Sequence, residues 1–299
     1  MTELRLGLIG LDTSHVKVFS RLLNDPNDPN HVPGARVVAG FPGGSPDFRA
    51  SISRVEGYTK ELRDQYGVRI VDSPEEVAER CDAILLTSVD GRVHPEQFAR
   101  IAPYGKPVFI DKPLAVSLEG ARAIAETAEK YGIAWMSGSV RRFADALIEA
   151  MNREEDGCIT GADCYGPIEF TPTQPGYFWY GIHLVEVLYR IMGPGCRSVT
   201  AFSGNGYETV TAVWQDGRIG SLRGNSGNIS HGAWIHREKR TLYADTAADQ
   251  QRKYANLLRA ALDMFKTGKP AIAPQETLEI IRFIEAVNES RESGKTVLL

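Results

Sequence analysis

A lysine between an aspartate and a proline is the most prominent candidate for chemistry in this sequence. The short apolar run Val108–Ile110 is followed directly by Asp111, Lys112 and Pro113. A strand that ends in a charged pair before a proline is typical of the carboxyl edge of a parallel sheet, where open α/β sheets bind ligands. Because proline restricts its own backbone and that of the preceding residue, we expect Lys112 to be extended and to point into a crevice. The alternative is an exposed lysine in an ordinary strand-to-helix turn.

The turn after the first predicted strand is a second candidate site. Leu4–Ile9 is a short, mostly apolar run, and a helical pattern begins a few residues after it. Strand, glycine, turn and helix in this order begin a Rossmann unit, in which the amino end of the helix favours an anion such as a pyrophosphate. The candidate cofactor-binding residues of this turn are Gly10, Leu11, Asp12, Thr13, Ser14 and His15.

This turn departs from the Gly-x-Gly-x-x-Gly fingerprint of dinucleotide-binding units. Asp12 and His15 stand where the second and third glycines would be. A carboxylate about 4 Å from a phosphate costs roughly 1–4 kcal/mol at a surface-like dielectric, which weakens dinucleotide binding about tenfold to a thousandfold. The alternative is that Asp12, Thr13 or Ser14 caps the helix. The same backbone could still contact a cofactor in that case.

The second predicted strand, Arg36–Phe41, lacks the acid that an NAD-binding unit usually has at its end for the ribose. Three polar residues follow it in the chain, namely Ser45, Arg49 and Arg54. They could meet a 2′-phosphate, which favours NADP over NAD. The alternative is that they are solvated loop residues.

The elements that position these residues alternate between helix and strand as far as residue 136. Helices are predicted at 60–66, after Ser73 and at 117–131, and strands at 68–71, 82–88, 108–110 and 133–136. This alternation favours a doubly wound parallel sheet. Thr87 and Ser88 end one of these strands and His94 opens the next helix, so we add these three, with Asp111, to the candidate cofactor site.

The second half of the chain has an α+β pattern. Helices are predicted at 144–153, from Gly176 to Met192, and at 251–265 and 275–289, and residues 158–170 are loop or strand. Strands are predicted at 197–203, 208–215, 218–223 and 234–243, and they alternate as in an antiparallel sheet. We therefore expect a Rossmann-like domain over 1–138 and an α+β domain with a large, mainly antiparallel open sheet over 139–299.

The composition excludes several classes of protein. The 299 residues carry a net charge of -4, with 42% hydrophobic and 24% charged residues, as in ordinary globular proteins. There is no basic stripe for nucleic acid, no apolar run long enough for a membrane span and no signal peptide pattern at the N-terminus. The four cysteines include no Cys-x-x-Cys, so we expect reduced thiols and a cytoplasmic protein.

The order of these parts resembles the Gfo/Idh/MocA family (glucose-fructose oxidoreductase, inositol dehydrogenase, rhizopine catabolism). The matching pieces are Gly7–Gly10, Asp82–Thr87 with His94 downstream, Gly105–Leu114 and Arg141–Phe143. The resemblance covers essentially the whole chain. Its most specific part is the Lys-Pro element followed about thirty residues later by Arg-Arg-Phe. The family usually has Glu-Lys-Pro, so the aspartate at 111 is a conservative departure.

The resemblance implies a catalytic role for Lys112 and His183. The matching lysine of the family lies in the active site beside the nicotinamide and the substrate. His183 matches the acid/base histidine of an Asp-x-x-x-His helix, with both residues on one face, and Trp179 replaces the aspartate. The alternative for His183 is a hydrogen-bonded core histidine. Trp179 and Tyr180 could stack on a sugar face or belong to the core.

The sequence thus predicts an NAD(P)-dependent oxidoreductase that moves a hydride between nicotinamide and a hydroxyl or carbonyl carbon of a small sugar, polyol or derivative. The resemblance implies a homodimer or higher homo-oligomer formed through the C-terminal sheet. A second hypothesis is a ligand-binding or regulatory member of the same fold that has lost dinucleotide binding. In a third, Asp12, His15, His94 and His183 converge on a metal, but no local ligand spacing supports it and we predict no metal site.

Overall fold

The chain forms two compact units in the computed structural model, which describes residues 3–227, 229–248 and 251–299. One unit runs to Gly138 and includes Tyr254–Thr277, and the other comprises Ser139–Lys253 and Leu278–Leu299. The predicted division at residue 138 instead assigns the whole tail to the second domain. The difference has a packing cause, because the Tyr254 ring lies 5.3 Å from the ring of His15 in the first unit. Helix α8 (Arg252–Thr267) therefore packs mostly in that unit.

The first unit is built around a six-stranded parallel sheet in the order β3-β2-β1-β4-β5-β6. This is the doubly wound order, and it confirms the predicted α/β class. The order reverses between β1 and β4, so the topological switch point lies at the carboxyl ends of these two strands. The strands are β1 (Leu4–Ile9), β2 (Ala35–Phe41), β3 (Arg69–Ile70), β4 (Ala83–Leu86), β5 (Val108–Ile110) and β6 (Trp135–Ser137).

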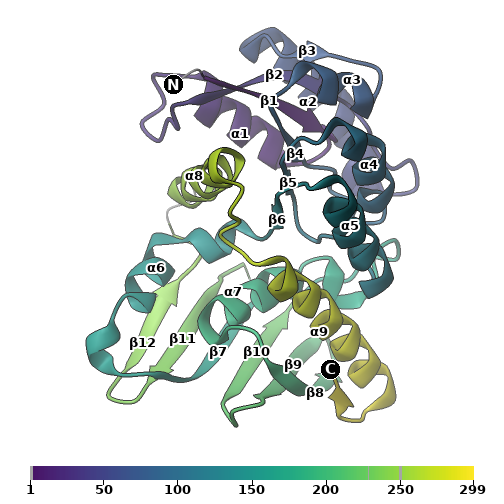
Figure 1. The fold of residues 1–299 in the computed structure, drawn as a ribbon. Helices are drawn as coiled ribbons and strands as arrows, with labels where there is room; N and C mark the ends of the chain where they lie inside the picture. Colours follow the sequence, from purple (N-terminus) through teal and green to yellow (C-terminus); the bar gives the residue numbers. More distant parts are fainter. Residues whose placement is uncertain (1–2, 228, 249–250) are drawn as a thin grey trace. The chain divides into compact units, whose positions relative to one another are not determined.

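Helices cover both faces of this sheet, and α1 lies on the opposite side from α4 and α5 (Figure 1). The prediction of a helix at 60–66 was too short, because α2 begins at Arg49. Residues 49–59 are mostly polar, so they lack the apolar periodicity that marks a helix. The helices are α1 (Ser14–Asn24), α2 (Arg49–Tyr66), α3 (Pro74–Arg80), α4 (His94–Ile101) and α5 (Leu118–Tyr131).

The second unit contains a seven-stranded sheet in the order β12-β11-β7-β10-β9-β8-β13. Only the pair of β7 with β10 is parallel among the pairings of the described residues, so the sheet is mainly antiparallel as predicted. The strands are β7 (Ile159–Pro167), β8 (Cys196–Gly204), β9 (Tyr207–Trp214), β10 (Ile219–Asn225), β11 (Gly232–Arg237), β12 (Thr241–Asp245) and β13 (Val297–Leu298).

The prediction of one strand at 234–243 is wrong, because β11 and β12 form a hairpin there. The backbone N–H of Arg237 donates to the carbonyl oxygen of Arg240 at 2.9 Å and closes the turn. The turn contains the three charged residues Glu238, Lys239 and Arg240, all of which are exposed. Three consecutive charged side chains cannot alternate between a buried and an open face of a sheet, so the chain turns there.

The prediction of a single helix that contains both Trp179 and His183 is also wrong. A 3-10 turn spans Gly176–Phe178, and α7 (Ile182–Met192) begins after Trp179. Gly176 has a φ of +47°, outside the helical region, and a Cβ there would lie 2.1 Å from Oδ1 of Asn288. Helices α6 (Asp145–Met151) and α9 (Pro274–Ser293) complete the secondary structure of this part of the chain. None of the helices of the described residues has the length and apolar character that a membrane span requires.

Candidate functional site

Lys112 lies two residues after Ile110, the last residue of β5, and β5 is one strand away from the switch point. Its backbone N–H donates to Oδ1 of Asp111 at 2.9 Å, and the peptide bond to Pro113 is cis. The residue is 7% exposed. Within the described residues, no hydrogen bond or ion pair joins the ammonium group to the protein. The ammonium group therefore remains available to a ligand.

Asp111 contacts His15, which stands at the third glycine position of the fingerprint. Oδ2 of Asp111 lies 2.8 Å from Nδ1 of His15, and both side chains are buried. Burial alone raises the pKa of Asp111, but the nearby charges of His15 and Lys112 outweigh it and lower the pKa to about 2. The carboxylate is therefore ionised at neutral pH, and it contacts both the His15 ring and the Lys112 backbone.

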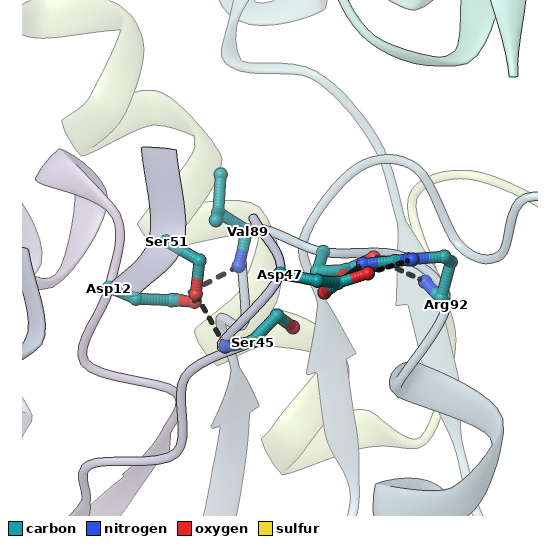
Figure 2. Close-up of polar contacts among 7 residues, drawn as sticks. Asp12, Ser45, Asp47, Ser51, Val89 and Arg92 are labelled. Carbon is teal, nitrogen blue, oxygen red and sulfur yellow. Dashed lines mark hydrogen bonds and ion pairs between the residues drawn. The ribbon is translucent and has the colours of Figure 1, made fainter. Parts of the chain in front are cut away.

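The carboxylate of Asp12 is directed into the protein (Figure 2). Its Oδ2 accepts a hydrogen bond from the Ser51 hydroxyl at 2.5 Å, and its Oδ1 accepts one from the Val89 backbone N–H at 3.0 Å. Burial raises the pKa of Asp12, and these two hydrogen bonds oppose that effect. Asp12 therefore ties the loop after β1 to the start of α2 and to the loop after β4.

Thr13 is the N-cap of α1. Its hydroxyl accepts a hydrogen bond from the backbone N–H of His15 at 3.4 Å, and Ser14 is the first residue of the helix. Of the three predicted capping residues, Thr13 therefore has this role. Because the Asp12 carboxylate is bonded to Ser51 and Val89, it does not cap α1.

The ends of β1 and β4 meet at the switch point. Gly10 has a φ of +87°, and a Cβ on it would lie 2.5 Å from Cα of Ser88, so only glycine fits there. The Thr87 hydroxyl donates to the carbonyl oxygen of Gly10 at 2.9 Å, and the Ser88 hydroxyl donates to Gln97 at 2.8 Å. The backbone N–H of Leu11 donates to the Pro42 carbonyl at 2.7 Å. The side chains of Thr87 and Ser88 are thus used to hold this edge together.

His94 has both ring nitrogens near backbone carbonyl oxygens. Nδ1 lies 3.0 Å from the oxygen of Pro113 and 3.2 Å from that of Leu114, and Nε2 lies 2.8 Å from that of Ser88. The buried ring therefore links the loop after β4 to the segment of Lys112. In the described part of the chain, no group of three or more His, Cys, Asp or Glu residues is arranged to hold a metal ion.

An ion-pair network that the sequence analysis missed lies beside these residues. Arg92, in the loop after β4, pairs with Asp90 and with Asp47 in the loop after β2. The loop that carries Ser45 and Asp47 runs between Asp12 on one side and Arg92 on the other (Figure 2). The signal in the sequence is the acid Asp47, which lies six residues beyond the end of β2 and not at the end of the strand itself.

His183 lies in the first turn of α7 in the second unit. Its Nδ1 lies 2.7 Å from the Ser139 hydroxyl, which also accepts a hydrogen bond from the Arg141 backbone N–H at 3.2 Å. The Tyr180 ring lies 5.9 Å from the His183 ring, and the Trp179 ring lies 5.5 Å from that of Tyr180. Ser139 thus orients the imidazole. The half-buried ring of Tyr180 lies next to the imidazole, and the half-buried ring of Trp179 lies next to that of Tyr180.

A second histidine near His183 was also missed. The ring of His231 lies 6.3 Å from that of His183, at an angle of 89°. Burial, reinforced by the charges of Arg141 and Lys253, lowers the pKa of His231 to about 3, so the ring is neutral at neutral pH. Its only signal in the sequence was a histidine just before a predicted strand. Because Lys112 and His183 belong to different units, their joint action on one substrate stays a prediction.

The first unit matches a family described as an oxidoreductase family with an NAD-binding Rossmann fold, over residues 15–139. The chain is similar to scyllo-inositol 2-dehydrogenase (NAD(+)) of Bacillus subtilis (strain 168), with 27% identity over 188 residues, or 58% of this chain and 51% of that protein. It is also similar to inositol 2-dehydrogenase of Cereibacter sphaeroides (strain ATCC 17023), with 33% identity over 132 residues, or 43% of this chain and 34% of that protein. The chain thus spans about half or less of the length of these relatives.

A solved structure shares the fold over nearly the whole chain. It is scyllo-inositol dehydrogenase from Lactobacillus casei with bound cofactor NAD(H) and scyllo-inositol. The TM-score is 0.81 at 15% identity, with 99% of each chain covered. At this level of identity the similarity concerns the fold alone, and it agrees with the predicted pairing of a Rossmann-like sheet with a second, mainly antiparallel sheet.

Proposed function

We propose that this chain is an NAD(P)-dependent oxidoreductase of the Gfo/Idh/MocA family that acts on CH–OH groups, a proposal supported by the family match over residues 15–139 and by the similarity to inositol dehydrogenases. The substrate class we propose is a small polyol, sugar or sugar derivative, in line with the inositol named for the relatives. The observation that carries the proposal is the position of Asp12. Its carboxylate accepts hydrogen bonds from Ser51 and Val89, which stabilise its charge within the protein and lessen the objection to a dinucleotide at this edge of the sheet.

The residues at the carboxyl edge of β1 fit a dinucleotide. Gly10 allows the close approach of β1 and β4, and the backbone N–H groups of Thr13 and Ser14 at the amino end of α1 would hold the pyrophosphate. Asp111 and Lys112 would lie toward the nicotinamide. When bound, the nicotinamide supplies the hydride donor or acceptor.

Lys112 and His183 would act on the substrate hydroxyl. The Lys112 ammonium would donate a hydrogen bond to the hydroxyl oxygen and stabilise negative charge there. His183 would take the hydroxyl proton during oxidation and return it during reduction. The contact of Ser139 with Nδ1 would hold the His183 ring in position for this exchange.

Titration with NADH and NADPH, followed by nicotinamide fluorescence, tests the proposal. We expect micromolar binding of at least one cofactor, and reduction of NAD+ or NADP+ by a member of a panel of inositols and sugars. If neither cofactor binds at millimolar concentrations while circular dichroism shows a folded protein, the chain is instead a ligand-binding or regulatory member of the family.

We also propose that the chain forms a homo-oligomer through the open face of the seven-stranded sheet. Trp234 and Tyr243 lie opposite each other on β11 and β12, with ring centroids 4.9 Å apart. Other exposed aromatic residues on this face are Phe202 and Tyr207. Exposed apolar patches of this kind mark interaction surfaces.

Light scattering tests the proposed oligomer. It should give an oligomer for the wild type and a smaller species for Trp234→Ser. A monomeric wild type at micromolar concentration contradicts the proposal.

A cytoplasmic location is also part of the proposal. All four cysteines are free thiols. Burial raises the pKa of Cys81 and of Cys196 to about 12, which keeps both in the unreactive thiol form. Unpaired, protonated thiols suit a reducing compartment. Fractionation of cells that produce the tagged protein tests this, and recovery outside the cytoplasm would contradict it.

A further inference from the structure

Arg92 is bound by two carboxylates that come from different parts of the chain. Its Nη1 and Nη2 donate to Oδ2 and Oδ1 of Asp47, both at 2.8 Å. Its Nε donates to Oδ1 of Asp90 at 3.0 Å, and Nη2 also donates to Oδ2 of Asp90 at 2.7 Å. Each of the three guanidinium nitrogens is therefore engaged by a carboxylate.

This network lies at the edge of the sheet where a dinucleotide would bind. Asp47 follows β2 and Arg92 follows β4, and these two strands flank β1. The ion pair of Asp47 with Arg92 therefore joins the two loops that follow the strands on either side of β1. In doubly wound folds the acid that binds the adenosine ribose follows β2, and an arginine nearby accommodates the 2′-phosphate of NADP.

The charges of the network favour a ribose over a phosphate. Two carboxylates and one guanidinium give the three side chains a net charge of about −1. The Asp47 side chain is 62% exposed, whereas that of Arg92 is 33% exposed and that of Asp90 only 1%. The hydrogen bonds from Arg92 lower the pKa of Asp47, so this carboxylate is charged at neutral pH. Ribose hydroxyls can donate to Asp47, but a 2′-phosphate meets a like charge and a guanidinium whose nitrogens are already engaged.

We propose that the network of Asp47, Arg92 and Asp90 makes this chain select NAD(H) against NADP(H), with Arg92 as a latent 2′-phosphate-binding residue that Asp47 holds inactive. This inference rests on the proposed dinucleotide-dependent function. It reverses the preference for NADP predicted from Ser45, Arg49 and Arg54. Ser45 is buried, with its backbone N–H bonded to the Ser51 hydroxyl at 2.8 Å, and Arg49 and Arg54 belong to α2.

Dissociation constants of NADH and NADPH for the wild type and for Asp47→Asn test this selectivity. The substitution keeps the size of the side chain and removes one negative charge. Because asparagine has one acceptor oxygen in place of two, one of the two hydrogen bonds from Arg92 to residue 47 is lost. We expect the wild type to bind NADH at least about tenfold more tightly than NADPH, because like charges within a few ångströms cost at least that much. Asp47→Asn should tighten NADPH binding about tenfold or more and should weaken NADH binding.

Glu75→Gln is the matched control. Glu75 forms a two-bond pair with Arg100 at 2.7 Å for each bond, between α3 and α4. This variant removes the same charge from a similar ion pair of the same unit, and it should leave the ratio of the two dissociation constants unchanged. A third variant, Arg92→Ala, should bind NADPH most weakly of all, since both carboxylates then lose their cation. Thermal melting of each variant shows whether it is folded.

Three results would overturn the selectivity while leaving the proposed function intact. They are equal affinity of the wild type for the two cofactors, an unchanged ratio in Asp47→Asn, and the same change of ratio in Glu75→Gln. If the folded wild type binds neither cofactor, the proposed function fails and the selectivity fails with it. These outcomes are distinct in one set of fluorescence titrations.

Discussion

Nδ1 of His15 lies 2.8 Å from Oδ2 of Asp111, at the position where the fingerprint would have its third glycine. That glycine normally allows a helix to pack closely on its strand. In this chain the contact between His15 and Asp111 links α1 to the end of β5. It thereby connects the turn after β1, which lacks two glycines of the fingerprint, to the segment that carries Lys112. The contact makes the two departures from the family pattern, the histidine at 15 and the aspartate at 111, parts of one arrangement.

Asp111→Asn should therefore destabilise the first unit. The carboxylate is buried, and its pKa is lowered to about 2 from an ordinary value of 3.8. A group with a depressed pKa stabilises the fold above its unfolded pKa, and this contribution is lost as the pH falls from about 4 toward 2. At pH 7 we expect a loss of about 2 kcal/mol in the free energy of unfolding, measured by urea denaturation.

The exposed Asp216→Asn, in the hairpin turn between β9 and β10, is the control for this substitution. It removes the same charge and should change the stability by less than about 0.5 kcal/mol. Repeating the urea denaturation at pH 3 should narrow the gap between wild type and Asp111→Asn. A gap that stays constant between pH 7 and pH 3 would show that the charge of Asp111 is not the source of the effect.

Lys112→Ala should lower turnover strongly and leave the fold intact. The ammonium makes no hydrogen bond or ion pair among the described residues, so its removal breaks no such contact in the sheet and takes away only its electrostatic effect on Asp111. Loss of a group that stabilises charge on the reacting oxygen lowers kcat by roughly 10²–10³-fold. Steady-state kinetics with the best substrate of the inositol and sugar panel measures this. Lys106→Ala, at the other end of β5, is the control and should retain full activity.

Ser139→Ala tests whether the hydroxyl positions His183. The hydrogen bond of 2.7 Å fixes the ring through Nδ1. A neutral hydrogen bond contributes about 0.5–1.5 kcal/mol, so kcat should fall roughly two- to tenfold with little change in KM. The pH profile of kcat should shift as well, because the hydroxyl no longer favours one form of the ring. Ser139→Thr keeps the hydroxyl and should restore both values; equal losses in the two variants would mean a packing role only.

The sequence predicts the architecture well because the strands of the first unit are short apolar runs bounded by turns. Leu4–Ile9 and Val108–Ile110 are buried over most of their length, so composition alone marks them. The polar start of α2 was missed because its helical structure depends on tertiary packing. The charged turn at 238–240 was missed because it depends on the pairing of β11 with β12. The spacing of apolar residues along the chain predicts neither of these features.

Side-chain direction was the part of the site that sequence reasoning could not supply. Asp12 was expected either to oppose a phosphate or to cap α1, yet it binds Ser51 and Val89, which are 39 and 77 residues away along the chain. Asp47 and Arg92, 45 residues apart, meet only in the folded unit. Such contacts depend on which strands are neighbours in the sheet, so a sequence motif alone cannot predict them.

His231→Gln should make the protein more resistant to mild acid. The pKa of this buried histidine is lowered from 6.5 to about 3, so below pH 6.5 the unfolded chain binds a proton that the folded chain does not. Stability therefore falls as the pH falls from 6.5 toward 3.

His231 should account for a loss of about 2 kcal/mol in the free energy of unfolding between pH 7 and pH 5, and the His231→Gln variant should not show this loss. Urea denaturation at the two pH values measures this difference, with His31→Gln as a control for the loss of a histidine in the first unit. If His231→Gln loses as much stability as the wild type, or if the His231 ring signal in NMR titrates near pH 6.5, the ring is not held neutral by burial beside Arg141 and Lys253.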